Sequence, residues 1–201
     1  MAKGKDIKLA TDKVLAHVTN RVGHIIFNNP ERHNAVSLDM WDAVEEALLA
    51  FSTDENIRVV VLSGAGGKSF VSGADISKFD RERGSKEAVA HYNARVKIIY
   101  KSIENFAKPT IAMINGYCMG GGLNLAACTD FRIASTKSKF AMPAAKLALG
   151  YPFEAINRLI KPCVWWFCRE LAANHLFLVR IYQNLIANAG QKRQLTITMP
   201  A

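Results

Sequence analysis

Three consecutive glycines lie within the stretch Asn115-Gly-Tyr-Cys-Met-Gly-Gly-Gly-Leu-Asn124. The run before it, Thr110 to Ile114, is short and apolar and predicts a buried strand. The run after it, Leu123 to Cys128, consists mainly of small and apolar residues and predicts a buried helix. A turn between them would present the unpaired N–H groups of the first helical turn, where the helix dipole favours negative charge. We therefore expect the turn to receive a ligand oxygen; the alternative is a tight turn packed against its neighbours.

The composition is that of a soluble globular protein. The chain has 201 residues, of which 50% are hydrophobic and 21% are charged. No apolar run reaches the roughly 18 residues that suggest a membrane-spanning helix. The polar segment Met1 to Lys8 lacks the apolar core of a signal peptide. We therefore expect no membrane partner and a cytoplasmic location.

Neither a metal site nor nucleic-acid binding is expected. The cysteines have spacings that fit no zinc pattern and apolar neighbours that suggest buried thiols, and they are Cys118, Cys128, Cys163 and Cys168. The net charge is +9, but residues 161–201 hold five basic residues and one acid, which is +4 of the +9. The remainder has no basic patch interleaved with aromatic residues. This distribution suits a small anionic ligand at least as well as a nucleic acid.

Strands alternate with helices along the chain, which predicts an α/β fold with a largely parallel sheet. A hairpin is expected around Asn20-Arg21, a helix after the N-cap Ser37, and a strand over Ile57 to Leu62. The hairpin strands are Val14 to Val18 and Val22 to Phe27. The helix after Ser37 has an apolar face that consists of Leu38, Trp41, Val44 and Leu48.

A second turn of small residues, Phe70 to Ile76, comes before a charged segment, Arg81 to Ser85, which we expect to be mobile. A long helix is expected from Ser85 to a point before Pro109. Its predicted buried stripe is Val89, Tyr92, Val96, Ile99, Ile103 and Phe106. In parallel sheets, ligands gather where loops leave the carboxyl ends of strands, so both turns of small residues are candidate ligand sites.

Five ordered segments together resemble the crotonase (enoyl-CoA hydratase/isomerase) superfamily. These segments are Asn29 to Ala35, Phe70 to Ile76, Ile111 to Gly122, Thr129-Asp130 and Phe140 to Tyr151. The resemblance covers roughly residues 10 to 160. It implies a fold of repeated ββα units that binds an acyl-CoA thioester. CoA would then be part of the substrate, so no separate cofactor is expected.

The resemblance also implies which residues form the site. Two backbone N–H groups, those of Ala74 and Gly121, would hold the thioester oxygen as it gains charge in an enolate-like intermediate. Further substrate contacts are implied for Ser72, Gly73, Asp75, Ile76 and Gly120, with the backbone of Ser72 to Ile76 meeting the adenine of CoA. Arg32 is expected near the CoA phosphates; the alternative is a solvated arginine.

Both acid–base positions of a hydratase are empty. A hydratase of this family uses two glutamates to activate and deliver water. Asn124 stands at the first of these positions and Ala144 at the second. Neither an amide nor a methyl group can shuttle a proton at neutral pH. Asn124 can orient a water or a polar acyl group, or it can be a hydrogen-bonded buried amide. We therefore expect no hydration of enoyl-CoA by the two-glutamate route.

Two other functions are compatible with the same motifs. Malonyl-type decarboxylation needs an oxyanion hole but no strong base, and Tyr151 falls where such enzymes of the family carry a tyrosine; the alternative is a packing role. Those enzymes keep an acid at the Asn124 position, so the match is partial. The third possibility is a protein without catalysis that binds acyl-CoA or assembles with relatives.

The resemblance stops near residue 160, which predicts an acyl-CoA-binding core over residues 1–160 and an atypical, partly helical segment over 161–201. Family members continue instead with helices that cover the acyl pocket and build trimers. The family therefore implies a homotrimer or a dimer of trimers, an expectation that the altered end weakens. The abrupt change after residue 160 suggests a truncated copy or another reading frame.

Overall fold

A computed structural model of the chain describes residues 5–143, 150 and 152–160. The chain divides into two compact units, Met1–Phe140 and Ala141–Ala201. The second unit contains helix α5, Phe153–Ile160. Tyr151, Ala144 and the whole segment 161–201 lie outside the described residues. The division expected at residue 160 stays a prediction.

The first unit is built on a six-stranded sheet in the order β1-β2-β3-β4-β6-β8. Its strands are β1 Lys5–Ile7, β2 Val14–Thr19, β3 Val22–Phe27, β4 Val59–Gly64, β6 Thr110–Ile114 and β8 Phe131–Ala134. From β3 to β8 the strands are parallel, whereas β1, β2 and β3 pair antiparallel. The largely parallel sheet is thus confirmed.

The predicted hairpin is confirmed, and its turn explains its register. Asn20 and Arg21 both have positive φ angles, 50° and 67°. Two such residues form the tight turn whose twist matches that of paired strands. The predicted strand over Ile57 to Leu62 is confirmed as β4, which begins two residues later than expected, at Val59, and runs to Gly64.

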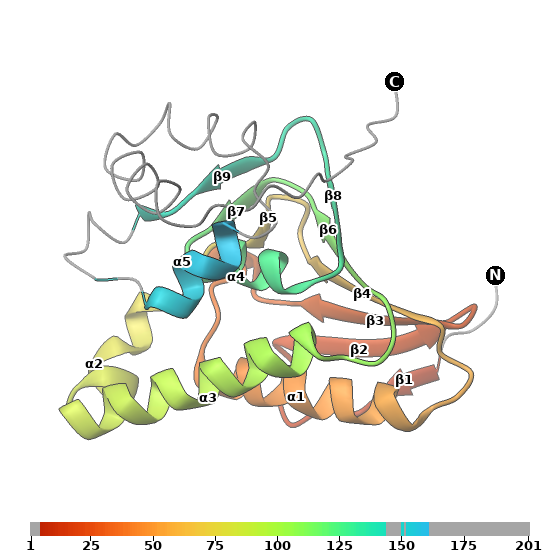
Figure 1. Cartoon of the computed structure of the whole chain (residues 1–201), viewed down its shortest axis with the longest axis horizontal. Helices are drawn as coiled ribbons and strands as arrows, with labels where there is room; N and C mark the ends of the chain where they lie inside the picture. The colour runs from red at the N-terminus through yellow and green to blue at the C-terminus, as the bar shows by residue number, and fades with distance from the viewer. Residues whose placement is uncertain (1–4, 144–149, 151, 161–201) are drawn as a thin grey trace. The chain divides into compact units, whose positions relative to one another are not determined.

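Two long helices cover one face of the sheet. Helix α1 spans Leu38–Thr53 and helix α3 spans Lys86–Glu104. They pack against each other, and α1 also contacts β2 and β3. Figure 1 shows α1 (orange) and α3 (green) side by side below the strands. The core residues that α1 contributes are Met40, Trp41, Ala43, Val44, Ala47, Leu48 and Phe51.

The predicted stripe of α3 is confirmed only in part. Tyr92, Ile99 and Ile103 are buried, whereas Val89 is exposed and Phe106 lies beyond the end of the helix at Glu104. Tyr100, which the stripe omitted, is buried as well. The N-terminal half of α3 therefore buries fewer of its apolar residues than their helical spacing predicted.

The charged segment Arg81 to Ser85 was expected to be mobile, and its first three residues belong to a short helix. A 3-10 turn, η2, spans Ile76–Lys78 and leads into helix α2, Phe79–Arg83. The Arg83 guanidinium lies 4.5 Å from the ring centroid of Phe79 and 3.9 Å from that of Tyr92. These cation–π contacts tie the charged segment to α3. Another 3-10 turn, η1, spans Pro30–Arg32.

A second, smaller sheet has the order β5-β7-β9. Its strands are β5 Ser69–Val71, β7 Tyr117–Met119 and β9 Lys139–Ala141. Strand β7 was not predicted, since its residues lie within the stretch expected to be the glycine-rich turn. Helix α4, Gly121–Cys128, follows as predicted. The order is therefore strand β6, strand β7, glycine turn and helix.

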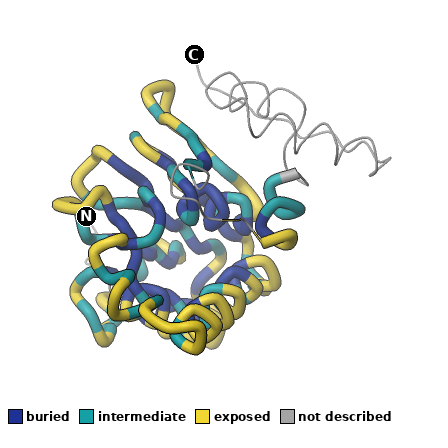
Figure 2. The backbone as a smooth tube through the Cα atoms, turned by 90° about the vertical axis from the view of Figure 1, so that its left-hand side faces the viewer, coloured by how far each residue is buried: buried dark blue, intermediate teal, exposed yellow. Residues whose placement is uncertain are grey.

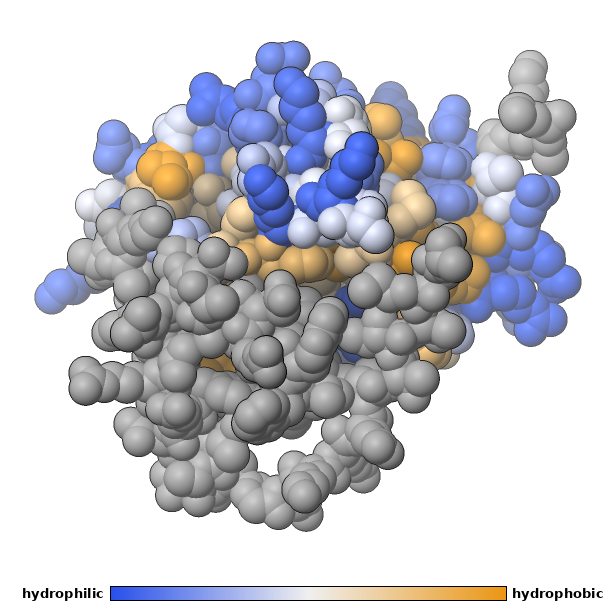
Figure 3. Space-filling model, turned by 90° about the horizontal axis from the view of Figure 1, so that it is seen from above, coloured by the Kyte–Doolittle hydropathy of each residue, from blue (hydrophilic) through white to orange (hydrophobic). Residues whose placement is uncertain are grey.

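Burial follows these layers. Figure 2 shows the buried backbone (dark blue) gathered inside the unit and exposed segments (yellow) around it. Cys118 and Cys128 are buried free thiols, as expected, and burial raises the pKa of Cys118 well above its ordinary value. Figure 3 shows hydrophobic residues reaching the surface between hydrophilic ones. No helix in the described part of the chain is long and apolar enough to cross a membrane.

Candidate oxyanion site

The fold brings the two predicted turns together. Strands β5 and β7 are parallel neighbours, so their carboxyl ends lie at the same edge of the small sheet. The turn after β5 contains Gly73 and Ala74, and the turn after β7 contains Gly120 and Gly121. A Cβ built on Gly73 would lie 3.8 Å from the backbone nitrogen of Gly121. Residues 47 positions apart in the chain therefore share one small region.

Val36 determines the direction of the Ala74 peptide. The Val36 N–H donates to the Gly73 carbonyl at 2.8 Å, and the Asp75 N–H donates to the Val36 carbonyl at 2.9 Å. This is a parallel bridge between Val36 and Ala74, in which the flanking peptides bond to the partner. The N–H of Ala74 itself points to the other side. Among the described residues, no hydrogen bond uses it.

The Gly121 N–H is the first donor of helix α4. The Gly120 carbonyl accepts from the N–H groups of Leu123 at 3.1 Å and Asn124 at 3.2 Å, and Gly120 provides no side-chain cap. The N–H of Gly121 has no acceptor within the described part of the chain. Such first-turn donors are those that an anionic oxygen can meet.

Glycine is required at two points of this turn. Gly120 has a φ of 52° and a ψ of −116°, which residues with a Cβ rarely adopt. Gly122 lies so close to β5 that a Cβ on it would be 2.1 Å from the carbonyl oxygen of Val71. The three-glycine stretch therefore allows helix α4 to start directly against β5.

Tyr100 is a site residue that sequence reasoning missed. Its hydroxyl donates a hydrogen bond to the Gly121 carbonyl at 3.0 Å. It comes from α3 and packs edge-on against Trp41, with ring centroids 5.4 Å apart. The sequence held one indication of this role. Tyr100 follows Ile99 in the predicted buried stripe of a helix, and a buried tyrosine hydroxyl usually has a hydrogen-bond partner.

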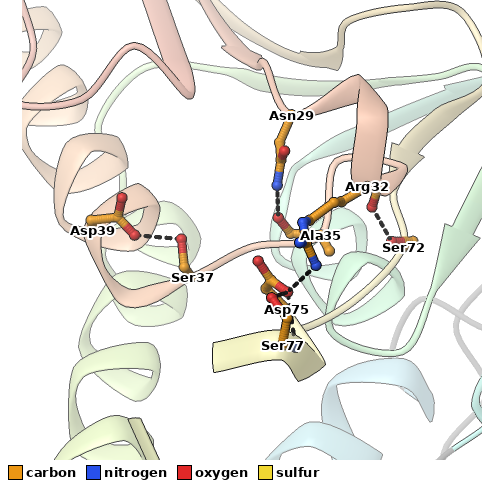
Figure 4. Close-up of polar contacts among 8 residues, drawn as sticks. All are labelled: Asn29, Arg32, Ala35, Ser37, Asp39, Ser72, Asp75 and Ser77. Carbon is orange, nitrogen blue, oxygen red and sulfur yellow. Dashed lines mark hydrogen bonds and ion pairs between the residues drawn. The ribbon is translucent and has the colours of Figure 1, made fainter. Parts of the chain in front are cut away.

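Three of the residues assigned to CoA contact, Arg32, Ser72 and Asp75, lie close together (Figure 4). Arg32 is 57% exposed, and its guanidinium lies 3.7 Å from the carboxylate of Asp75, which is 4% exposed. The same carboxylate accepts from the N–H and hydroxyl of Ser77. The Ser72 hydroxyl donates to the Arg32 carbonyl at 3.4 Å, and Ile76 is exposed. Arg32, Ser72 and Asp75 are thus brought together, and Arg32 stays accessible to an anion.

Asn34 holds the loop that carries Arg32, a role the sequence did not reveal. Its side-chain amide is buried and donates to the carbonyls of Ala65 and Ser69, and its oxygen accepts from the N–H of Asn29. Asn34 has a φ of 56°, a conformation that asparagine tolerates better than most residues. It therefore fixes the loop against the start of β5.

Asn124 is 2% exposed and lies three residues after Gly121, on the same face of α4. No carboxylate stands there. Elsewhere in the first unit, the pKa of Glu82 is raised, mainly because the carboxyl is partly buried. A hydrogen bond from the Leu38 N–H lowers this pKa, and the charges of Asp39 and Asp75 raise it. The described residues contain no group of three or more His, Cys, Asp or Glu side chains that would hold a metal ion.

The chain resembles known proteins over most of its length. A family model described as enoyl-CoA hydratase/isomerase matches residues 17–164. Crotonyl-CoA hydratase of Syntrophomonas wolfei is 32% identical over 151 residues, which is 75% of this chain and 57% of that protein. (E)-Benzylidenesuccinyl-CoA hydratase of Thauera aromatica is 38% identical over 135 residues, which is 67% of this chain and 52% of that protein.

A relative with a different named reaction is similar to about the same extent. The mitochondrial 3-hydroxyisobutyryl-CoA hydrolase of Homo sapiens is 31% identical over 141 residues, 70% of this chain and 36% of that protein. The chain thus spans between 36% and 57% of these relatives' lengths.

Solved structures show the same fold. An enoyl-CoA hydratase/carnithine racemase from Magnetospirillum magneticum has a TM-score of 0.73 and 32% identity, covering 77% of this chain and 58% of that one. The fold and the matched segments agree with this similarity. The chain belongs to the enoyl-CoA hydratase/isomerase family, within the crotonase superfamily.

Proposed function

We propose that this protein binds an acyl-CoA thioester and stabilises negative charge on its carbonyl oxygen through the N–H groups of Ala74 and Gly121. The observation that carries the proposal is the meeting of the two turns, with a Cβ position on Gly73 only 3.8 Å from the Gly121 nitrogen. Both N–H groups lack partners among the described residues. The names of the relatives, which are CoA hydratases and a CoA hydrolase, support a thioester as the ligand.

The chemistry follows from where charge develops. An enolate oxygen carries more charge than a thioester oxygen, so fixed donors stabilise the transition state more than the ground state. Losing one such donor typically costs about 3 kcal/mol of transition-state stabilisation. The dipole of α4, whose first residue is Gly121, adds to the effect.

Hydration of enoyl-CoA by the two-glutamate route is not expected of this chain. The resemblance places Asn124 at the position of the first hydratase glutamate, and an amide cannot act as a general acid or base at neutral pH. We therefore expect the protein to bind crotonyl-CoA but to hydrate it far more slowly than hydratases of the family do. Near-normal turnover of crotonyl-CoA would contradict this part of the proposal.

A pair of variants at Gly121 tests the oxyanion site itself. Gly121→Pro removes the N–H, and proline is tolerated at the first position of a helix. Gly121→Ala adds the same Cβ but keeps the N–H, so it is the matched control. We expect the alanine variant to keep a preference for butyryl-CoA over the S-butyl thioether, which lacks the carbonyl, and the proline variant to lose it. Equal preferences in both variants, measured by calorimetric titration, would refute a role for this donor.

Decarboxylation of a malonyl-type thioester is the second candidate. It needs less of the site than hydration does, because release of CO₂ leaves an enolate directly and needs no base to start. The decarboxylases of the family keep an acid at the position of Asn124, so the match to them is partial. Tyr151, which the resemblance assigns to such a reaction, lies outside the described residues. Incubation with malonyl-CoA and methylmalonyl-CoA, with detection of CO₂ and the shortened thioester, tests this candidate. Tight binding of thioesters without turnover of any of them would indicate a protein that binds acyl-CoA and does not catalyse a reaction.

A further inference from the structure

We propose that Tyr100 is a positioning residue of the oxyanion site, whose hydroxyl holds the first turn of helix α4 so that the Gly121 N–H stays directed at the thioester oxygen. The inference rests on the proposed function and extends it to a residue on a different helix. It starts from a group that the sequence motifs do not include, since Tyr100 lies on α3, 21 residues before Gly121.

The hydroxyl lies where the two turns meet. It donates to the Gly121 carbonyl at 3.0 Å. A Cβ built on Gly121 would lie 3.4 Å from the same hydroxyl and 3.8 Å from the Cα of Gly73. The hydroxyl therefore borders the space that a side chain at position 121 would take, next to the turn of Ala74.

The tyrosine ring is itself held firmly. Tyr100 is 8% exposed. Its ring packs edge-on against Trp41, and Trp41 packs edge-on against Phe27, with centroids 5.4 Å and 6.4 Å apart. Phe27 and Trp41 belong to the sheet and to α1, so the position of the hydroxyl is set by the main core of the unit. A well-packed ring of this kind is a suitable support for a hydrogen bond that must keep its direction.

The glycine turn needs such outside support. Gly120, Gly121 and Gly122 have no side chains that could anchor the turn, and Gly120 makes no side-chain cap. On one side the turn rests on β5, where a Cβ on Gly122 would be 2.1 Å from the Val71 carbonyl. The Tyr100 hydroxyl supplies a directional contact from α3. Together they confine a turn that glycine would otherwise leave flexible.

The test compares Tyr100→Phe with Tyr92→Phe. Both remove one hydroxyl from a buried tyrosine of α3, but the ring of Tyr92 lies under Arg83 and not at the turn. The probes are butyryl-CoA and its S-butyl thioether, titrated calorimetrically. We expect Tyr100→Phe to lower the affinity for butyryl-CoA about three- to tenfold, the range of one hydrogen bond, with the thioether unchanged. Tyr92→Phe should leave both affinities unchanged.

A spectroscopic measurement follows the carbonyl directly. The infrared stretch of ¹³C-labelled butyryl-CoA shifts to lower frequency when donors polarise the carbonyl. We expect Tyr100→Phe to bring this shift back toward the value in water, and 4-aminophenylalanine at position 100, which keeps a donor, to restore it.

The outcomes separate the two proposals. An equal loss of thioester and thioether affinity in Tyr100→Phe would mean that Tyr100 only supports the fold, and an unchanged carbonyl shift would also overturn the inference. If the unaltered protein binds neither probe, or binds both equally, the proposed function itself fails, and the role of Tyr100 fails with it.

Discussion

Neighbouring glycines of the α4 turn have very different amounts of room. A Cβ on Gly122 would lie 2.1 Å from the Val71 carbonyl oxygen and 2.8 Å from the Val71 Cβ, whereas a Cβ on Gly121 meets nothing closer than 3.4 Å. We predict that Gly122→Ala lowers the free energy of unfolding by about 1–3 kcal/mol, the usual cost of overpacking. Gly121→Ala should cost less than about 1 kcal/mol, since alanine favours the helix. Urea unfolding measures both, and similar losses would show that the steric reason is wrong.

His24 makes stability depend on pH. Its ring stacks on that of His17 with centroids 4.6 Å apart, and Asp6 faces His17 from β1. Burial first, and then the charge of His17, lower the pKa of His24 from its ordinary value of 6.5. Below pH 6.5, His24 therefore takes up a proton more readily in the unfolded chain than in the folded one. The stability that the neutral ring allows is complete above pH 6.5 and is lost as the pH falls through the lowered pKa.

We predict that the free energy of unfolding falls as the pH drops below the ordinary histidine pKa of 6.5, and that His24→Gln makes this fall smaller. His17→Gln should make it smaller to a lesser degree, because it removes only the weaker cause. Urea unfolding at several pH values is the measurement. A pH profile that His24→Gln leaves unchanged would assign the dependence to other groups.

At the scale of the elements, periodic patterns carried most of what could be predicted. The hairpin around Asn20 and the strand β6 follow from alternation and apolar runs. Strand β7 was missed because it has three residues between Gly116 and Gly120, too few for a pattern. Helix α2 was missed because its charges read as a solvated loop, whereas Arg83 packs between two rings.

The two N-cap serines differ in a way that sequence does not reveal. Ser85 accepts a hydrogen bond from the Ala88 N–H at 3.1 Å. Ser37 also occupies an N-cap, as predicted, but its hydroxyl donates to Asp39, and the Leu38 N–H bonds to Glu82 instead. The Ser37 side chain therefore makes no cap hydrogen bond, and a carboxylate from a distant segment, Glu82, bonds the first N–H of the helix.

We predict that Ser85→Ala costs about 1 kcal/mol of unfolding free energy, the typical value of a helix N-cap. Ser85→Asp keeps an acceptor at the same place and should cost much less, so it is the control. Both are measured by urea unfolding. If the aspartate variant loses as much as the alanine variant, the hydrogen bond to Ala88 is not the source of the effect.

At the scale of the whole molecule, the candidate site depends on topology. Neither the spacing between Ala74 and Gly121 nor the residue types around them places the two turns together; the parallel pairing of β5 with β7 does. The resemblance to a family implied that Ala74 and Gly121 act in one site, but it did not predict the strand pairing that brings their turns together. Tyr100 is not part of the motifs that carry the resemblance, and only the packing of α3 against α4 brings its hydroxyl to the Gly121 carbonyl.

The net charge of +9 gives a last prediction for the whole chain. A CoA thioester carries several phosphate charges, and Arg32 is exposed beside the segment assigned to CoA. Its partner Asp75 offsets part of its charge, but a pair with one exposed member is weak. We predict that the affinity for butyryl-CoA falls several-fold as salt rises from about 0.1 M to about 1 M, which shortens the Debye length from about 10 Å to about 3 Å. The 3′-dephospho thioester should show a shallower dependence, and Arg32→Ala should reduce the slope for the full ligand. An affinity that does not change with salt would mean that the positive charge of the chain serves something other than CoA.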